Sequence, residues 1–372
     1  MSVILPSALA LAEMGIAAGT GALLVLLVVP LVERGARRSG WMAVPTRARW
    51  HEGATPHLGG IALAVGIAAG VTVGGGGPAF ARPVWMGAGL LFVAGLADDL
   101  RGLRPSAKFG AQLGATALLL TAGLHFWPAG PTGVSALLTV LWVLGLTNAL
   151  NLVDAMDGIA AGVAALAALS LGVMSAWQGR LPLAVVAAAV AAVTIGFLAY
   201  NFSPARIFMG DCGSLPLGYL LAALGLGVQQ SGAAKIPALV PVVVLAVPLF
   251  DTLFVSATRL RRGQSVAEGG TDHTMHRLAR QGWSERQVAL LFYGAGVACG
   301  GIGVVGAVGP PLLFYGLAAG VGGGVLAVGR HLARQTGPGP TGPPDPASSA
   351  EERSVEIDER DRGAPTSEGT AP

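Results

Sequence analysis

The feature that most constrains this chain is a series of long apolar stretches without formal charge. They include residues 58–81, 159–179, 181–200 and 287–329. A transmembrane helix needs about 20 consecutive, mostly apolar residues, and these stretches have that length or roughly twice it. Charged residues make up 12% of the 372-residue chain, whereas soluble domains usually contain about 25%. The sequence therefore predicts an all-α polytopic membrane protein.

The spacing of charges and apolar runs predicts about ten or eleven transmembrane helices. Two of the runs, 83–97 and 215–229, are short enough to be re-entrant or tilted elements. The eleven predicted spans are residues 10–32, 58–77, 83–97, 109–127, 134–150, 159–177, 181–200, 215–229, 236–256, 287–308 and 311–329.

Basic residues are distributed unequally between the connecting segments. Fifteen Lys and Arg residues fall in alternate connections, whereas the other connections carry only Arg82, Arg180 and Lys235. Cytoplasmic loops of membrane proteins carry the excess of basic residues. The sequence thus predicts an N-terminus outside and a C-terminus in the cytoplasm, with five cytoplasmic connections at 33–57, 98–108, 151–158, 201–214 and 257–286.

Composition changes sharply near the end of the chain. Residues 1–334 form the predicted transmembrane domain, and residues 335–372 are rich in Pro, Gly, Ser, Glu and Asp. Such a segment cannot bury a core, so we expect a disordered cytoplasmic tail. The formal net charge of +3 is too small to argue for a nucleic-acid partner.

Acidic residues gather on the same predicted face as the basic loops. Asp98 and Asp99 end one span, Asp154 and Asp157 follow another, and Asp211 precedes a third. Carboxylates close to a bilayer are costly unless they are paired, solvated or bound to a cation. Each group could separately be a solvated helix end or a helix cap. Three such groups on one face favour a site for a hard cation such as Mg²⁺ together with substrate phosphates.

Four motifs follow one another along residues 41–279. They comprise Asp98, Asp99, Leu103, Pro105, Lys108 and Gln112; Asn148, Asn151, Asp154, Asp157 and Gly158; Asn201, Pro204, Phe208, Gly210, Asp211, Gly213 and Ser214; and Asp251, Arg259, Gly263, His273, His276 and Arg277. This order and spacing resemble the polyprenyl-phosphate N-acetylhexosamine-1-phosphate transferases, glycosyltransferase family 4. The ending His273-x-x-His276-Arg277-Leu278 is more similar to the undecaprenyl-phosphate GlcNAc-1-phosphate transferases than to the pentapeptide branch.

The resemblance implies a reaction and its partners. A polyprenyl phosphate in a bacterial plasma membrane would attack a UDP-N-acetylhexosamine from the cytoplasmic face and release UMP. The phospho-MurNAc-pentapeptide translocases are the alternative within the family. The resemblance is also compatible with a homodimer. A transporter is the alternative from another class, which predicts carboxylates near the bilayer midplane and often inverted repeats.

The resemblance also implies roles for individual residues. Asp98 would take a proton from the lipid phosphate, and Asp99 would orient nearby groups. Asn151 and Asp211 would hold Mg²⁺, for which Mn²⁺ is an alternative. The expected nucleotide- and substrate-binding residues are Asp154, Asp157, Asn201, Phe208, Lys108, Arg259, His273, His276 and Arg277.

Overall fold

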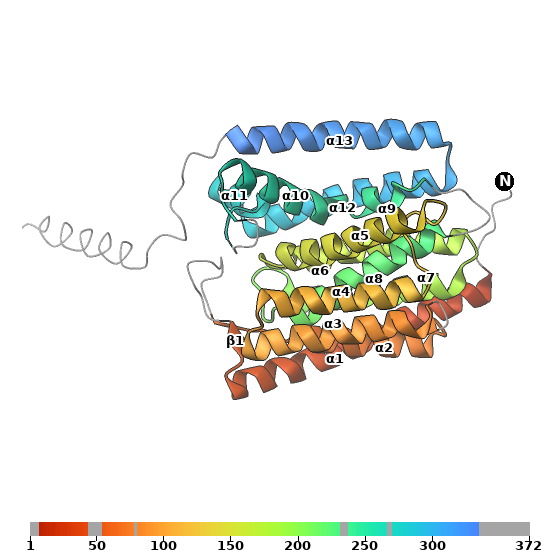
Figure 1. Cartoon of the computed structure of the whole chain (residues 1–372). Coiled ribbons are helices and arrows are strands. Elements are labelled where there is room, and N and C mark those ends of the chain that lie inside the picture. Colours follow the sequence, from red (N-terminus) through yellow and green to blue (C-terminus); the bar gives the residue numbers. More distant parts are fainter. Residues whose placement is uncertain (1–6, 44–53, 78–79, 231–236, 266–269, 335–372) are drawn as a thin grey trace, which may run out of the picture.

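A computed structural model describes residues 7–43, 54–77, 80–230, 237–265 and 270–334. Within these ranges the chain is helical apart from one small ribbon, in which β1 (Met42–Ala43) pairs antiparallel with β2 (Thr55–Pro56). The helices run side by side as one bundle, and β1 and α11 lie at the same end of it (Figure 1). The predicted tail, 335–372, lies outside the described residues.

The described helices, in chain order, are α1 (Ala8–Ser39), α2 (Gly59–Val73), α3 (Arg82–Arg101), α4 (Pro105–Thr121), α5 (Thr132–Val153), α6 (Ile159–Trp177), α7 (Leu181–Asn201), α8 (Asp211–Gln229), α9 (Val240–Val244), α10 (Ala246–Arg261), α11 (Thr274–Arg280), α12 (Glu285–Val308) and α13 (Pro311–Arg334).

Eight of the described helices are long and apolar enough to cross a membrane, namely α1, α3, α5, α6, α7, α8, α12 and α13. The predicted all-α polytopic membrane fold is therefore confirmed. The other three predicted spans are helical but shorter or broken. α2 has 15 residues and α4 has 17, and the ninth predicted span divides into α9 and α10.

The prediction of short elements at 83–97 and 215–229 is wrong. These stretches belong to α3, with 20 residues, and α8, with 19 residues. The sequence interpretation stopped each span at its charges, but Asp98 and Asp99 lie inside the last turns of α3. Asp211 is likewise the first residue of α8.

Helix α8 is the centre of the bundle. Every residue from Cys212 to Val228 except Pro216 is buried, and α8 contacts α3, α5, α6 and α2. Glycines allow two of these helices to approach closely. A Cβ atom on Gly60 of α2 would lie 2.2 Å from the Gly213 nitrogen, and one on Gly95 of α3 would lie 2.3 Å from the Asp211 carbonyl oxygen.

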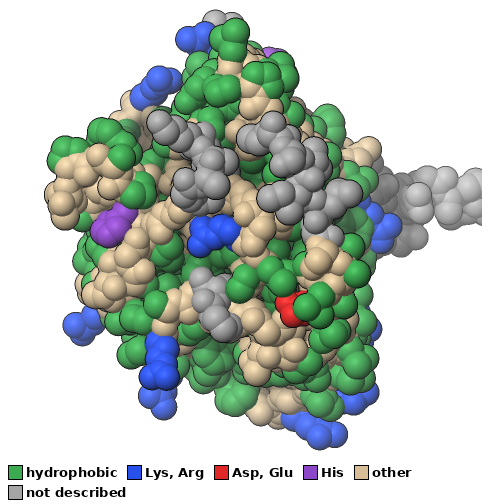
Figure 2. Space-filling view, turned by 90° about the vertical axis from the view of Figure 1, so that its right-hand side faces the viewer, with side chains coloured by type: hydrophobic (Ala, Val, Ile, Leu, Met, Phe, Trp, Pro, Cys, Tyr) green, Lys and Arg blue, Asp and Glu red, His purple; other side chains and the backbone are tan. Residues whose placement is uncertain are grey.

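The outside of the bundle is apolar. Helix α13 lies at one edge (Figure 1), and large side chains such as Leu312, Leu313 and Leu326 are exposed on it. Viewed from the end away from β1 and α11, the described surface carries much hydrophobic and little acidic area (Figure 2). The acidic residues that the sequence singled out lie toward the other end.

Candidate active site

A cavity of about 460 Å³ opens at the end of the bundle where β1 and α11 lie. Its wall combines the ends of α3 and α5, the segment before α8, the turn before α2, and the starts of α11 and α12. The lining residues are Met42, Ala43, His57, Asp98, Asp99, Asn151, Asp154, Ala155, Met156, Asp157, Asn201, Phe208, Gly210, Asp211, His276 and Glu285. Four segments far apart in sequence therefore bring their acidic side chains into one pocket.

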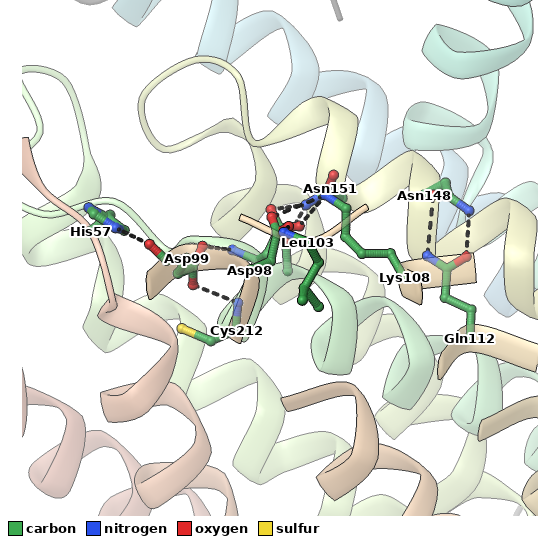
Figure 3. Close-up of polar contacts among 11 residues, drawn as sticks. His57, Asp98, Asp99, Leu103, Lys108, Gln112, Asn148, Asn151 and Cys212 are labelled. Atoms are coloured by element: carbon green, nitrogen blue, oxygen red, sulfur yellow. Dashed lines mark hydrogen bonds and ion pairs between the residues drawn. The ribbon is translucent and has the colours of Figure 1, made fainter. Parts of the chain in front are cut away.

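Lys108 links two of the carboxylates in this pocket. Its Nζ lies 3.1 Å from Asp98 Oδ2 and 3.1 Å from Asp211 Oδ2. The second oxygen of Asp98 accepts the backbone N–H of Leu103 at 2.7 Å, which holds the turn between α3 and α4. Both carboxylates are thus oriented by donors, and Lys108 offsets part of their negative charge (Figure 3).

Asp99 binds the first residues of α8. Its Oδ1 accepts the N–H of Asp211 and its Oδ2 accepts the N–H of Cys212, each at 2.9 Å. The first N–H groups of a helix have no partner within the helix, and a carboxylate there also interacts favourably with the helix dipole. The N-cap residue, Gly210, has no side chain to do this and adopts a φ of 71°. The adjacent Asp99 therefore fixes the position from which Asp211 enters the pocket.

Asn151 contacts the other side of Asp211. Its Nδ2 donates to Asp211 Oδ1 at 2.8 Å and to Ser214 Oγ at 2.9 Å. Asp211 thus receives Asn151 on one carboxylate oxygen and Lys108 on the other. The predicted pair of Asn151 and Asp211 is in direct contact.

A second acidic group forms another part of the wall. The Asp157 carboxylate accepts the N–H of Ala205 at 2.7 Å. Burial raises the pKa of Asp157 to about 6, the hydrogen bond from Ala205 opposes this, and the charge of Glu285 adds to it. Burial also raises the pKa of Asp154 well above its usual value, together with the charges of Asp211, Asp99 and Asp157. Negative charge is therefore crowded in the cavity.

Asn201 and Phe208 lie in the wall beside the turn that precedes α2. The N–H of Phe208 donates to the Pro56 carbonyl at 2.8 Å, and the N–H of Gly59 donates to the Phe208 carbonyl at 2.9 Å. Asn201 is 1% exposed and donates through Nδ2 to the Ile207 carbonyl, but its buried Oδ1 has no hydrogen-bond partner among the described residues. A buried polar atom without a partner is unfavourable unless a ligand or water completes it.

Helix α11 brings one of the predicted histidines to the cavity. His276 is in the lining, and burial lowers its pKa to about 4, with a further contribution from the neighbouring His273. His276 is therefore neutral at pH 7. Its ring can exchange a hydrogen bond with a ligand but supplies no positive charge.

Four predicted binding residues lie outside the lining: Lys108, which contacts the lining residues Asp98 and Asp211, and three residues near α11. His273 Nδ1 lies 2.7 Å from Asp251 Oδ2, and both side chains are buried. The Arg259 Nε donates to Asp272 Oδ2 at 2.9 Å. Arg277 donates through Nε to the Asp272 carbonyl at 2.8 Å and stacks over Phe254. The structure places His273, Arg259 and Arg277 in the packing of α11 against α10, outside the lining of the cavity.

Sequence reasoning missed two ionisable residues of the lining, His57 and Glu285. His57 Nε2 lies 3.0 Å from the Asp99 carbonyl oxygen, so this nitrogen carries the hydrogen. Glu285, the first residue of α12, accepts the hydroxyl of Ser203 at 2.7 Å. Glu285 is one of three acidic residues in the predicted cytoplasmic connection 257–286, and this position was the signal in the sequence that could have indicated it. Arg49 and His51, which precede His57 in the sequence, lie outside the described residues.

The donor set of the pocket fits a hard cation bound together with phosphates. Six lining side chains are carboxylates: Asp98, Asp99, Asp154, Asp157, Asp211 and Glu285. Within the described ranges, no group of three or more His, Cys, Asp or Glu side chains is arranged to hold a metal by itself. Mg²⁺ commonly binds one or two carboxylates and completes its shell with water and substrate phosphates. Asp211 and Asn151 supply oxygens of this kind.

Comparison with known proteins identifies the family. Residues 82–229 match the family described as Glycosyl transferase family 4. The chain is 34% identical over 287 residues to the "Probable undecaprenyl-phosphate N-acetylglucosaminyl 1-phosphate transferase" of Bacillus subtilis (strain 168), which covers 73% of this chain and 78% of that protein.

Two further relatives show the range of the similarity. The "Decaprenyl-phosphate N-acetylglucosaminephosphotransferase" of Mycolicibacterium smegmatis is 32% identical over 322 residues, covering 76% of this chain and 79% of that protein. The "Phospho-N-acetylmuramoyl-pentapeptide-transferase" of Listeria welshimeri is 33% identical over 139 residues, covering 37% of this chain and 39% of that protein. The four predicted motifs, the membrane-spanning bundle and these matches agree: the chain belongs to glycosyl transferase family 4.

Proposed function

We propose that this protein transfers N-acetylhexosamine 1-phosphate, with GlcNAc 1-phosphate as the expected group, from a UDP-sugar to a polyprenyl phosphate. An oxygen of the lipid phosphate attacks the sugar-side phosphorus. The bond between that phosphorus and the bridging oxygen of the diphosphate breaks, and UMP leaves. The products are a polyprenyl diphospho-sugar and UMP. The long matches to two transferases named for GlcNAc support this donor over the pentapeptide donor, whose named relative matches a much shorter part of the chain.

The observation that carries the proposal is the contact of Lys108 with both Asp98 and Asp211. Lys108, in the first turn of α4, thereby connects the C-terminal end of α3 with the N-terminal end of α8. Phosphoryl transfer depends mainly on positioning and on neutralising charge. A cluster at the end of the bundle, beside the apolar surface, is suited to a lipid phosphate whose tail remains in the bilayer.

Asp98 is the proposed base for the lipid phosphate. Its carboxylate is held by the Leu103 N–H on one oxygen and by Lys108 on the other, so it keeps a fixed direction. Lys108 would also attract the incoming phosphate. Asp99 would act through the backbone of Asp211 and Cys212, as an orienting residue.

Asn151 and Asp211 are the proposed residues for Mg²⁺, or for Mn²⁺ in its place. Both substrates carry phosphate, and the pocket itself contains six carboxylates, so bound cations are needed to balance the charge. When bound there, the ion would supply Lewis-acid stabilisation of the diphosphate oxygens.

The opposite part of the cavity would hold the nucleotide and the sugar. Phe208 offers a ring for stacking on uracil, and the unpartnered Asn201 Oδ1 offers an acceptor. Asp154, Asp157 and Glu285 offer acceptors for hydroxyl groups, and neutral His276 can bond a sugar or phosphate oxygen. His273, Arg259 and Arg277 would support α11 rather than touch the donor.

We further propose that the cavity faces the cytoplasm of a bacterial cell, with the N-terminus outside and the C-terminus inside. The distribution of Lys and Arg between alternate connections supports this orientation. The donor nucleotide is made in the cytoplasm, and in the proposed orientation the cavity opens to the cytoplasm.

A donor-comparison assay tests the function. Purified protein is given undecaprenyl phosphate and Mg²⁺ with either UDP-GlcNAc or UDP-MurNAc-pentapeptide, and UMP and the lipid product are measured. Formation of both from UDP-GlcNAc, and their loss with chelator, is the expected result. Product from the pentapeptide donor alone would change the branch of the family, and folded protein that uses neither donor nor another UDP-aminosugar would contradict the function.

A further inference from the structure

Gln112 and Asn148 form a pair of hydrogen bonds between α4 and α5. The Gln112 Nε2 donates to Asn148 Oδ1 at 3.2 Å, and the Asn148 Nδ2 donates to Gln112 Oε1 at 3.1 Å. The two amides therefore satisfy each other reciprocally (Figure 3). Gln112 is 2% exposed, whereas Asn148 is exposed, so loss of Asn148 would leave the buried Gln112 amide unsatisfied.

The pair lies one helical turn from two residues that contact Asp211. Lys108 precedes Gln112 by four residues on α4, and Asn151 follows Asn148 by three on α5, so each contact residue lies on the same helix face as its amide. Lys108 approaches one oxygen of Asp211 and Asn151 approaches the other, at 3.1 and 2.8 Å. The distance between α4 and α5 at this level decides whether both contacts can form together.

We infer that Gln112 and Asn148 are positioning residues, which hold Lys108 and Asn151 at the spacing needed on the two sides of Asp211. A further contact holds the Asn148 amide in place: its Nδ2 also donates to the Leu144 carbonyl at 2.7 Å. Neither amide is in the lining of the cavity, so their effect on the reaction passes through Lys108 and Asn151. This inference rests on the proposed function.

The substitution Gln112→Glu offers a readout that packing alone would not produce. A protonated carboxyl has one O–H donor and one acceptor, and so reproduces the two bonds of the amide pair. An ionised carboxylate can only accept hydrogen bonds, so it repels the Asn148 Oδ1 that accepts from Gln112 in the wild type. Its negative charge also attracts Lys108 away from Asp211. The charged groups nearest along these contacts are Lys108 on the same helix, Asp98 on α3 and Asp211 on α8.

The test measures kcat and KM for UDP-GlcNAc in wild type, Q112E and the double variant Q112L/N148L from about pH 4 to about pH 8, a range that spans the ordinary pKa of Glu and its rise on burial. The ratio of Q112E to wild-type kcat is expected to be highest at acid pH and to fall by about tenfold or more as pH rises, because small displacements of reacting groups have large effects. The double variant, whose side chains cannot ionise, is expected to show a reduced kcat with a constant ratio.

Two controls keep the inference separable from folding and from the proposed function. Melting temperatures establish that each variant is folded at both ends of the pH range. Adding Q112L to K108A is expected to lower kcat by a smaller factor than Q112L lowers it in the wild type, since the part of the effect that passes through Lys108 is already lost. A constant Q112E ratio, or a Q112L/N148L variant with wild-type kcat, would overturn the inference, whereas a wild-type protein without transferase activity would overturn the proposed function instead.

Discussion

The carboxylate of Asp99 lies 2.9 Å from the backbone nitrogen of Asp211 and bonds it directly. This contact joins the C-terminal end of α3 to the N-terminal end of α8 across 112 positions of the chain. The two neighbouring aspartates of α3 therefore do different things. Asp98 faces Lys108 through its side chain, whereas Asp99 orders the backbone from which Asp211 projects.

Replacing these aspartates should separate chemistry from structure. Asp98→Asn is expected to lower kcat by roughly a hundredfold or more, as for loss of a general base, with little change in melting temperature. Asp99→Ala is expected to lower both kcat and the melting temperature. Helix α8 then loses the acceptor for two N–H groups, which destabilises the protein by about 1–2 kcal/mol. Transferase assays and thermal unfolding in detergent check this. Equal stability losses in both variants would contradict the division of roles.

The close approach of α3 to α8 gives a second prediction. A Cβ atom at Gly95 would lie 2.3 Å from the Asp211 carbonyl oxygen, so Gly95→Ala must displace the start of α8. Overpacking of this kind costs about 1–3 kcal/mol, and activity should fall as Asp211 moves. Gly89→Ala is the matched control on the same helix, since no other part of the described chain lies within 4 Å of its Cβ position. Equal activity of the two variants would contradict the role of the close approach of α3 to α8 in placing Asp211.

Ionisation of Asp157 gives a pH dependence of stability. Its pKa is raised by burial from 3.8 to about 6. Protonation thus favours the folded state, and this contribution is complete below pH 3.8 and is lost as pH rises through about 6. Relative to Asp157→Asn, the wild type should lose on the order of 1–2 kcal/mol over this interval, a value reduced for partial exposure to solvent. Unfolding measured at several pH values checks the slope, and an opposite slope would refute the assignment.

The buried contact of Asp251 with α11 predicts an effect on donor binding. Asp251 accepts from Thr274 N at 2.7 Å and contacts His273 at 2.7 Å, and α11 carries His276 to the cavity. Asp251→Ala should destabilise the protein by about 2–3 kcal/mol and raise KM for the UDP-sugar. Asp272→Asn, at a partly exposed carboxylate of the same region, should change the stability and the KM for the UDP-sugar less than Asp251→Ala does. A larger effect from Asp272→Asn would place the main support of α11 elsewhere.

The sequence was sufficient for the membrane fold and for much of the cavity. Uncharged runs predict helices because the bilayer requires apolar length, and Asp98, Asp99, Asn151, Asp154, Asp157, Asn201, Phe208, Asp211 and His276 all lie in one lining. Helix ends were harder, because charges inside the last turns of α3 and the first turn of α8 were interpreted as loop residues. A charge can remain in a helix when another helix supplies its partner, as Lys108 does.

Partners distant in sequence explain the remaining differences. Nothing in the spacing of the fourth motif indicates that Asp272 binds Arg259 or that Asp251 binds His273. Those contacts place His273, Arg259 and Arg277 in the packing of α11, outside the lining of the cavity. Similarly, Glu285 enters the lining only because the start of α12 approaches Ser203, before α8.

The most direct test of the central claim follows the sugar-side phosphorus of the donor. Purified protein is incubated with undecaprenyl phosphate, Mg²⁺ and UDP-GlcNAc that carries phosphorus-32 only at that position. The account predicts that the label enters the lipid fraction in the same amount as GlcNAc and that the released UMP is unlabelled. Label that remains in a soluble UDP product while GlcNAc reaches the lipid would show ordinary glycosyl transfer and would contradict the account.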